Sequence, residues 1–420
     1  MEMAPTERQR IVITGMGAIT PLGQSVAEYW ENLVAGRSGT REMRLCDTTG
    51  YPCKVSGEVQ DWQPERFIDR KEARRMARFS QFAVAAAQQA VENAGLDLDR
   101  MDRTHVGVVL GNGNGGYPNI EEAVRTIVEK GGMRIDPLFM PKSLPNMAAA
   151  QISLQLGLKG ACSTIVTACA AGTQAIGEAA ELLRRGRMEV VLTGGAEAGI
   201  SQLGLGAFAV MRAMTTSFND TPARASRPFD RDRDGFVPSE GAAVFVLETL
   251  ARARARGARI LAEVAGYAAT ADAYHIVAPC ADGEGAARAI RWALEDAGVR
   301  PDQVDYINAH GTSTPLNDAS ETVAIKVALG EAAGAIPISS TKSMIGHALG
   351  AAGALETVAA VKTLETGIIH PTINHETPDP ECNLDYVPNV ARRADVRVVL
   401  KNSFGFGGQN ACLVLRRVDS

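Results

Sequence analysis

The sequence predicts an α/β protein in which buried sheets are covered by helices. Short apolar runs alternate with longer helical patterns, and several of the runs end in glycine. The runs are rich in β-branched residues, which is typical of strands buried inside a layered α/β fold. The same alternation occurs twice along the 420 residues. A chain of this length exceeds one ordinary core, so we expect two packed halves.

The first half begins with an apolar run at residues 11–14, which we expect to end at Gly15 and Gly17. Residues 80–94 are rich in alanine and contain no glycine or proline, and Gly95 then provides a helix stop. Three further apolar runs predict strands, and one more helical pattern follows. These strands are expected at residues 106–110, 190–195 and 242–248, and the helix at residues 174–186.

The second half repeats this pattern. The helix that ends in Glu92-Asn-Ala-Gly95 resembles the one that ends in Glu295-Asp-Ala-Gly298, and a short loop and a strand follow each. We interpret the similarity as an internal duplication, with an N-terminal half at residues 1–255 and a C-terminal half at residues 256–420. Because no low-complexity linker separates them, the halves should pack as one body. The strands are expected at residues 260–266, 304–309, 396–400 and 411–415, and the helices at residues 285–298 and 350–364.

Composition excludes several classes of protein. The net charge is −5, from 43 Lys and Arg against 48 Asp and Glu, which argues against a general nucleic-acid binder. No window approaches the ~18 consecutive apolar residues of a membrane span, and the N-terminus lacks the apolar core of a signal peptide. The seven cysteines form no CxxC pair, and their odd number suggests reduced thiols. We therefore expect a cytoplasmic protein without a membrane or nucleic-acid partner.

Cys169 is the first candidate for chemistry. It follows an apolar, strand-like run and precedes a helical pattern, so we expect it on a sharp strand-to-helix turn. At such a turn the helix dipole and free N–H groups stabilise a thiolate. The small neighbours Ala168, Ala170 and Gly172 leave room for a substrate. The alternative is a buried structural cysteine, which is the commoner fate of a single thiol.

Two histidines favour the catalytic interpretation. His310 and His347 each follow a strand pattern and lie beside glycine, in His310-Gly-Thr-Ser-Thr and Lys-Ser-Met-Ile-Gly-His347. A neutral imidazole there can donate from Nε2 to a developing oxyanion or take a proton from a thiol. Near the C-terminus, residues 402–408 read Asn-Ser-Phe-Gly-Phe-Gly-Gly. This stretch predicts either a mobile loop that completes an oxyanion hole or a turn that connects two strands.

Together these motifs resemble the elongating β-ketoacyl-acyl carrier protein (ACP) synthases, of the synthase II type. The matching segments are Thr-Ala-Cys169-Ala, His310-Gly-Thr-Ser-Thr, Lys342-Ser-Met-Ile-Gly-His347 and Asn-Ser-Phe-Gly-Phe-Gly-Gly, in the family's order over nearly the whole chain. Residues 12–15, 227–236 and 315–322 agree as well. The resemblance implies the thiolase-like fold, in which two duplicated halves form a five-layer αβαβα sandwich. It also implies a homodimer.

The resemblance further implies a decarboxylative condensation. Cys169 would hold an acyl group taken from acyl-ACP, and malonyl-ACP would lose CO2 to give an enolate that attacks this group, as in fatty-acid elongation. His310 and His347 would stabilise the enolate, and the N–H groups of Cys169 and Phe406 would stabilise the second oxyanion. Lys342 would supply positive potential. The resemblance implies no metal and no bound cofactor, since phosphopantetheine arrives on the carrier protein.

Several residues are expected to bind the substrate or its carrier. Thr312 and Thr314 match family contacts to phosphopantetheine, and the glycine-rich loop around Asn114 matches a loop that lines the acyl pocket. Glu356 matches a family carboxylate in the Lys342 network, although these two residues alternatively form a structural ion pair. A basic patch matches the family's docking surface for acidic carrier proteins, with a solvated helix face as the alternative. Its residues are Lys71, Arg74, Arg75, Arg134 and Arg212.

Two departures from the family pattern leave the acyl chain open. Asn114 stands where synthase II enzymes usually carry an apolar residue, and Val277 and Ala278 stand where many carry hydroxyl groups that touch pantetheine. One alternative is therefore a stand-alone ketosynthase of a polyketide or polyene pathway. Another is an inactive partner subunit like a chain-length factor, against which the catalytic cysteine and histidines speak.

Overall fold

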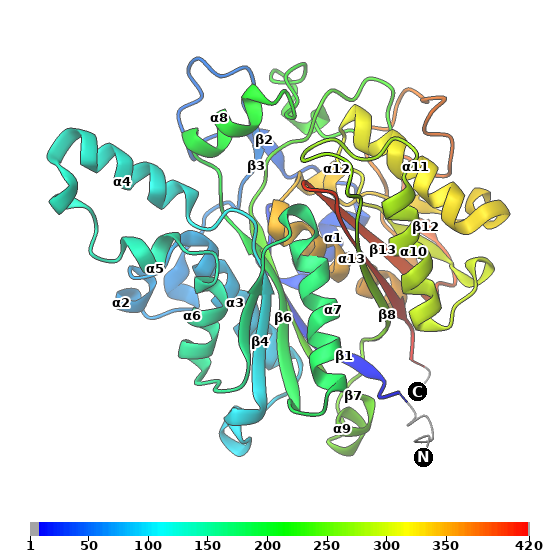
Figure 1. Cartoon of the computed structure of the whole chain (residues 1–420), viewed down its shortest axis with the longest axis horizontal. Helices are drawn as coiled ribbons and strands as arrows, with labels where there is room; N and C mark the ends of the chain where they lie inside the picture. Colours follow the sequence, from blue (N-terminus) through cyan, green and yellow to red (C-terminus); the bar gives the residue numbers. More distant parts are fainter. Residues whose placement is uncertain (1–7, 419–420) are drawn as a thin grey trace.

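The computed structural model describes residues 8–418, and their main sheet consists of two matching halves (Figure 1). In each half, three parallel strands are followed by two antiparallel strands. From edge to centre, the first half consists of β5 (Cys162–Ile165), β4 (Val106–Gly111), β6 (Val190–Glu197), β7 (Gly241–Thr249) and β1 (Ile11–Ile19). The second half consists of β10 (Ile338–Ser339), β9 (Tyr306–Asn308), β13 (Val398–Gly405), β14 (Gln409–Arg416) and β8 (Ala262–Ala271).

The helices complete a five-layer arrangement that confirms the predicted fold class (Figure 1). The first half-sheet is covered on its outer face by α3 (Arg78–Asn93) and α6 (Met147–Leu156), and the second by α10 (Glu284–Ala297) and α11 (Pro315–Leu329). Between the half-sheets lie α7 (Ala171–Arg184) and α13 (Ala352–Thr366). Three large apolar clusters fill the spaces between these layers. The half-sheets join where β1 pairs with β8.

The first strand is longer than its sequence pattern predicts. We expected it to end at Gly15, but β1 continues through Gly17 to Ile19, with a register shift after Ile13. The two glycines are packing positions and not a strand end. A Cβ at Gly15 would lie 2.2 Å from the Ala90 carbonyl oxygen of α3, and one at Gly17 would make the same short contact with another carbonyl of that helix. The absence of side chains therefore lets α3 lie directly on β1.

The glycine-rich motif near the C-terminus is mostly strand. β13 extends to Gly405 and pairs with β14 across a tight connection, so only Phe406, Gly407 and Gly408 form the turn. The two turn glycines have φ values of 83° and 67°, in the left-handed region that favours glycine. The stretch therefore forms the connection between two strands that one of the two expectations described.

The remaining elements surround this framework. In Figure 1, α4 projects from the body beside the first half-sheet. No helix within residues 8–418 combines the length and apolar character needed to cross a membrane. The further helices are α1 (Val26–Val34), α2 (Arg70–Ala73), α4 (Tyr117–Lys130), α5 (Phe139–Ser143), α8 (Gln202–Val210), α9 (Leu250–Ala255) and α12 (Lys342–Ile345), and the further strands are β2 (Thr40–Glu42), β3 (Val55–Gly57), β11 (Ile368–Ile369) and β12 (Arg392–Arg393).

Candidate active site

Cys169 lies on the sharp turn that connects β5 to α7. The turn is strained, because Ala168 has a φ of 49°, a backbone conformation that residues with a side chain seldom adopt. This geometry places the cysteine at the N-terminus of α7, with only 7% of its surface exposed. The space beside Gly172 is filled by backbone of the second half and not left for a substrate. A Cβ at this position would lie 2.9 Å from the Gly350 carbonyl oxygen and 2.9 Å from the Ala354 amide nitrogen.

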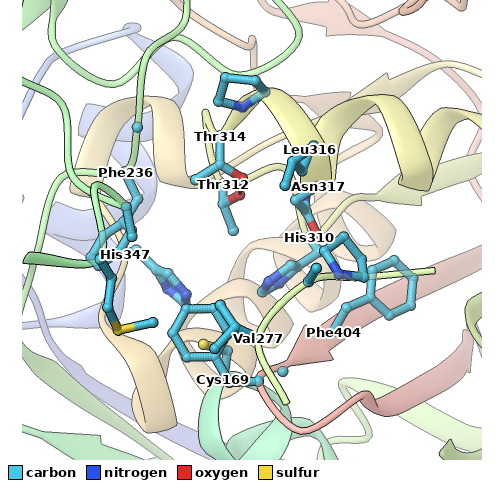
Figure 2. Close-up of a pocket in the computed structure, with 18 of the residues that line it drawn as sticks. Cys169, Phe236, Val277, His310, Thr312, Thr314, Leu316, Asn317, His347 and Phe404 are labelled. Atoms are coloured by element: carbon cyan, nitrogen blue, oxygen red, sulfur yellow. Dashed lines mark hydrogen bonds between the residues drawn. The ribbon is translucent and has the colours of Figure 1, made fainter. Parts of the chain in front are cut away.

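The two predicted histidines meet above the cysteine. His310 follows β9 and His347 follows α12, and their rings stand nearly perpendicular with centroids 5.4 Å apart. Figure 2 shows both rings directed into the cavity that Cys169 also lines. Phe404 packs edge-on against His310, and Phe236 packs edge-on against His347. The structure therefore brings the three residues together and holds each ring with an aromatic neighbour.

Hydrogen bonds fix which ring nitrogen of each histidine carries the proton. Lys342 Nζ lies 3.2 Å from His310 Nδ1, and an ammonium group can only donate, so Nδ1 accepts and the proton resides on Nε2. His347 Nδ1 accepts from the backbone N–H of Leu349 at 3.3 Å, which gives the same tautomer. Both histidines therefore present an Nε2–H donor to the cavity. This assignment favours oxyanion stabilisation over removal of a thiol proton.

Burial keeps both rings uncharged. It lowers the pKa of His310 and of His347 well below 6.5, and the charge of Lys342 lowers both further. At neutral pH the two groups are then hydrogen-bond donors without a full charge. Such donors are suited to an enolate, whose developing charge they stabilise without a competing proton transfer.

Burial of Cys169 favours the thiol over the thiolate that its turn led us to expect. Burial raises the pKa of Cys169 to about 12, because a dry site disfavours the charged sulfur. The charge of Lys342 and the N–H of Phe406, which lies against the sulfur, both lower this pKa but do not cancel the effect. The position at a helix N-terminus was correctly predicted, whereas the degree of enclosure could not be seen in the sequence.

The end of β13 lies directly against the nucleophile turn. A Cβ at Gly405 would lie 2.8 Å from the Thr167 carbonyl and 3.2 Å from the Cys169 amide nitrogen. Only glycine permits this approach, which brings the Phe406 N–H to the cysteine sulfur. The N–H groups of Cys169 and Phe406 are thus available at one place, as an oxyanion hole requires.

Behind the histidines lies a network of buried charges. Lys342 and Glu356 form an ion pair in which neither side chain is more than 1% exposed. Glu321 accepts from the backbone N–H groups of His310 and Gly311 at 2.8 and 2.7 Å, which fixes the loop that carries the histidine. Glu356 is fully buried among these groups and does not line the cavity. Its predicted contact with substrate is therefore replaced by ion pairing, the alternative considered for it.

The cavity has a volume of about 370 Å³ and extends from Cys169 past the predicted pantetheine contacts. Thr312 and Thr314 line it, and their hydroxyl oxygens lie 2.8 Å apart (Figure 2). Asn114 does not line it. Its backbone N–H lies 3.3 Å from Glu197 Oε1, and its side-chain amide packs against Gly199, whose Cβ would lie 2.9 Å from Nδ2.

The predicted docking residues are exposed but do not form one patch at the cavity. Arg212 lines the mouth of the cavity. Lys71 belongs to α2, Arg74 and Arg75 follow it directly, and Arg134 lies beyond α4. Arg75 pairs with Glu72, a neighbour on its own turn of chain, at 2.8 Å. Within one subunit, only Arg212 is placed to contact a substrate arm that enters the cavity.

Sequence reasoning missed several residues of the site. Glu197, at the end of β6, accepts from the N–H groups of Gly113 and Gly350 and so ties together loops from both halves. Burial raises its pKa to about 7. Lys401 is a second buried lysine beside Glu356. Neither residue carried a clear local signal, since Lys401 follows the end of the apolar run Val398-Val-Leu400 and is itself followed by the polar residues Asn402 and Ser403.

The fold and the site together define a class of protein. A cysteine on a strand-to-helix turn, facing two neutral imidazole donors within a duplicated five-layer fold, is the arrangement of a thiolase-like condensing enzyme. Models of the β-ketoacyl synthase N-terminal and C-terminal domains match residues 8–253 and 261–376. The chain belongs to the β-ketoacyl synthase family.

Individual relatives agree with this assignment. The chain is 49% identical to a Synechocystis 3-oxoacyl-[acyl-carrier-protein] synthase 2 over 415 residues, which cover 99% of the chain and 100% of the relative. It is 46% identical to the Staphylococcus aureus (strain COL) protein of the same name, with the same coverage.

Two solved structures resemble the fold over 98% of this chain and 100% of their own length. The ishigamide ketosynthase/chain length factor has a TM-score of 0.92 at 39% identity. A type II polyketide ketosynthase in complex with its acyl-carrier protein has a TM-score of 0.89 at 38% identity.

Proposed function

We propose that this chain is an elongating β-ketoacyl-ACP synthase that condenses an acyl group on Cys169 with malonyl-ACP in fatty-acid elongation. The observation that carries the proposal is the convergence of one cysteine sulfur and two Nε2–H donors, from His310 and His347, in a single cavity. The names and identities of the full-length relatives support the same activity.

In the first stage the acyl group moves from the carrier to the enzyme. The sulfur of Cys169 attacks the thioester carbonyl of acyl-ACP, and the bond to the pantetheine sulfur breaks. The N–H groups of Cys169 and Phe406 stabilise the oxyanion between these events. Because the resting residue is a thiol, it must lose a proton as it reacts, and the departing pantetheine thiolate takes up one proton. The transfer is therefore neutral overall.

In the second stage malonyl-ACP occupies the same cavity. Its carboxylate leaves as CO2, and the electron pair of the broken C–C bond forms an enolate whose oxygen accepts from His310 and His347. The enolate carbon then attacks the acyl-Cys169 carbonyl. Cleavage of the C–S bond releases β-ketoacyl-ACP and leaves its electron pair on the sulfur of Cys169, which takes up one proton from solvent to restore the thiol. The apolar neighbours Phe404 and Phe236 exclude water from the histidines during these steps.

Acyl- and malonyl-ACP are the proposed partners. A similar ketosynthase has been solved in complex with its acyl-carrier protein. Arg212 at the cavity mouth offers a cation to an acidic carrier, and Thr312 and Thr314 offer hydroxyl groups to its pantetheine arm. We assign Lys71, Arg74, Arg75 and Arg134 to the same encounter at longer range, where the attraction between opposite charges raises the association rate.

We further propose a homodimer joined through the free edge of the first half-sheet. β5 is the edge strand, and its first residues are exposed. Apolar side chains of the same half are exposed as well, with Leu154 of α6, which packs beside β5, at 69% and Val128 of α4 at 80%. An unpaired strand edge beside exposed apolar groups is stabilised by pairing with a second copy.

Light scattering after size exclusion tests the dimer. Introducing charge with Val128→Glu and Leu154→Glu should yield a monomer. The control is Val390→Glu, which changes an apolar residue that is 74% exposed in the second half. A wild-type monomer, or equal effects of test and control variants, would contradict the proposal.

A second candidate function is a ketosynthase of a polyketide or polyene pathway. The Nδ2 atom of Asn114 is buried without a hydrogen-bond partner within the described residues, beside Gly199. That amide does not line the cavity, and the candidate is carried instead by similarity: a type II polyketide ketosynthase and the ishigamide ketosynthase/chain length factor share the fold at 38% and 39% identity. The discriminating experiment offers saturated acyl-ACPs of increasing length and β-keto- or polyenoyl-ACPs in parallel with malonyl-ACP, and identifies products by mass. Elongation of the saturated series supports the first function.

Mass spectrometry tests the central claim. Incubation with acyl-ACP should add the acyl mass to the protein at Cys169, and Cys169→Ala should abolish both this adduct and condensation. The alanine variant should still release CO2 from malonyl-ACP, because His310 and His347 remain. Condensation by the variant, or an adduct on another of the seven cysteines, would show that the nucleophile is wrongly assigned.

A further inference from the structure

Lys401 is a buried cation that none of the steps above uses. It lies on β13 with no exposed surface. Its Nζ is 2.6 Å from Glu356 Oε2, donates to the Asn402 carbonyl at 2.6 Å, and also donates to Ser403 Oγ. An ammonium group removed from water is tolerated only when its charge and its donors are satisfied. The cluster around Lys401 provides both.

Glu356 is shared between two lysines. Its Oε1 accepts from Lys342, and its Oε2 faces Lys401. One carboxylate cannot neutralise two ammonium groups, so the trio keeps a net positive charge directly behind His310, whose Nδ1 lies 3.2 Å from Lys342 Nζ. Without Lys401, Glu356 would be left to neutralise Lys342 alone. The positive potential at the histidines would then be lost.

A second connection joins Lys401 to the nucleophile. Ser403 Oγ lies 2.8 Å from Thr173 Oγ1, and Thr173 is on α7, one turn beyond Cys169. The strand that carries Lys401 also carries Gly405, which contacts the nucleophile turn. Lys401 is thus attached both to the charges behind the histidines and to the frame of the oxyanion hole.

We propose that Lys401 is a positioning residue for the condensing reaction, whose buried ammonium group occupies the second oxygen of Glu356 and so leaves the charge of Lys342 free to hold His310 and His347 as neutral donors. The proposal deepens the condensing function above and rests on it. Lys401 touches no reacting atom, so it acts through Glu356 and Lys342.

The charges of the two lysines change the pKa values of the histidines in the direction that this role requires. After burial, the charges of Lys342 and Lys401 both lower the pKa of His310 and of His347. Removing Lys401 should therefore raise these values, and removing the carboxylate of Glu356 should lower them further. Other titratable groups face the same cluster from neighbouring elements. They are Glu321 of α11, Cys412 of β14, Tyr306 of β9, Tyr29 of α1 and His370, which directly follows β11.

The test measures CO2 release from malonyl-ACP against pH in the full chain. The variants are Lys401→Met, which removes the charge at nearly constant volume, Glu356→Gln, and the double variant. Neutral histidines are lost at low pH, so each rate falls on the acid side. In Lys401→Met the pH at which the rate falls on the acid side, the acid limb, should move upward by about one pH unit. In Glu356→Gln the acid limb should move downward, and in the double variant it should return toward the wild-type position. A purely structural role would not move the limb in opposite directions.

The outcomes separate the two proposals. Acid limbs that stay in place, or that move in the same direction in both single variants, overturn the role of Lys401. If Lys401→Met does not fold, the effect of Lys401 can still be measured by comparing Glu356→Gln with the double variant. These two proteins differ only at residue 401, and neither contains a Glu356 carboxylate that could be left without a partner. Their limbs must then differ, with the double variant higher. A wild-type protein that releases no CO2 overturns the condensing function itself, and this inference with it.

Discussion

Replacing Gly405 by alanine would separate the oxyanion hole from the histidines. The added Cβ would lie 2.8 Å from the Thr167 carbonyl and 3.2 Å from the Cys169 amide. Ordinary heavy-atom contacts are about 3.5 Å, so the two backbones must move apart by roughly half an ångström. Both contacts are to backbone, which cannot turn aside as a flexible side chain can. The Phe406 N–H would therefore retreat from the reacting carbonyl.

The size of the effect follows from the role of that donor. Complete loss of one oxyanion donor lowers kcat by about 10²–10³-fold. A donor displaced by a fraction of an ångström should lower the condensation kcat by about 10–100-fold. Decarboxylation of malonyl-ACP should change less than about threefold, because His310 and His347 are held by other elements, through Glu321 and the Leu349 amide.

Two assays on the same protein decide the matter. Product mass reports condensation, and CO2 release in the absence of an acyl primer reports decarboxylation. Gly334→Ala is the matched control, because nothing lies within 4 Å of a Cβ at that position. Unchanged condensation in Gly405→Ala would refute the assignment of the Phe406 N–H. An equal loss of both activities would refute the separation of the two donor pairs.

Three other predictions follow from the same geometry. His347→Ala should slow CO2 release by about 10²-fold or more, whereas His105→Ala, which changes an exposed histidine paired with Asp102, should leave the rate unchanged. The pKa of Glu197 is raised from 4.5 to about 7 by burial, so the unfolded state loses this proton first and stability falls as pH rises through that interval. Urea denaturation measures the free energy of unfolding of wild type and of Glu197→Gln at each pH. The value for wild type minus the value for the variant should decrease by about 3 kcal/mol between about pH 4.5 and about pH 8. A difference that stays constant over this range would contradict the prediction. Gly17→Ala should destabilise the protein by about 1–3 kcal/mol through collision with α3, and an unchanged Tm would show that β1 and α3 can separate without cost.

Much of the fold could be predicted because the signals are local. Residues 80–94 favour a helix, since they contain good helix formers and no glycine or proline, and α3 covers almost the predicted range. The apolar runs at residues 106–110 and 242–248 correspond to β4 and β7, and neither strand extends more than one residue beyond the predicted range at either end. The predicted end of a strand was wrong where a glycine marks a close contact with another element and not a turn. Gly15 and Gly17 looked like a strand end but are contact points for a helix.

The residues of the candidate site could be predicted from the sequence, whereas their protonation states could not. Cys169, His310 and His347 lie in short motifs whose residue types suit the chemistry, so sequence alone could nominate them. Which nitrogen of each ring carries its proton depends on Lys342 and Leu349, and only the folded chain places these donors. The protonation state of Cys169 depends on how completely later segments enclose it.

The sequence by itself indicated the layered fold, the candidate nucleophile and the two imidazoles, because periodicity and side-chain chemistry are properties of short segments. The tertiary structure alone decided the buried network of Lys342, Glu356 and Lys401. These residues come from α12, α13 and β13, and their charges acquire their strength only when folding removes them from water. Lys401 looks like an ordinary polar residue after an apolar run in the sequence, and in the structure it is one of two buried lysines that share the carboxylate of Glu356.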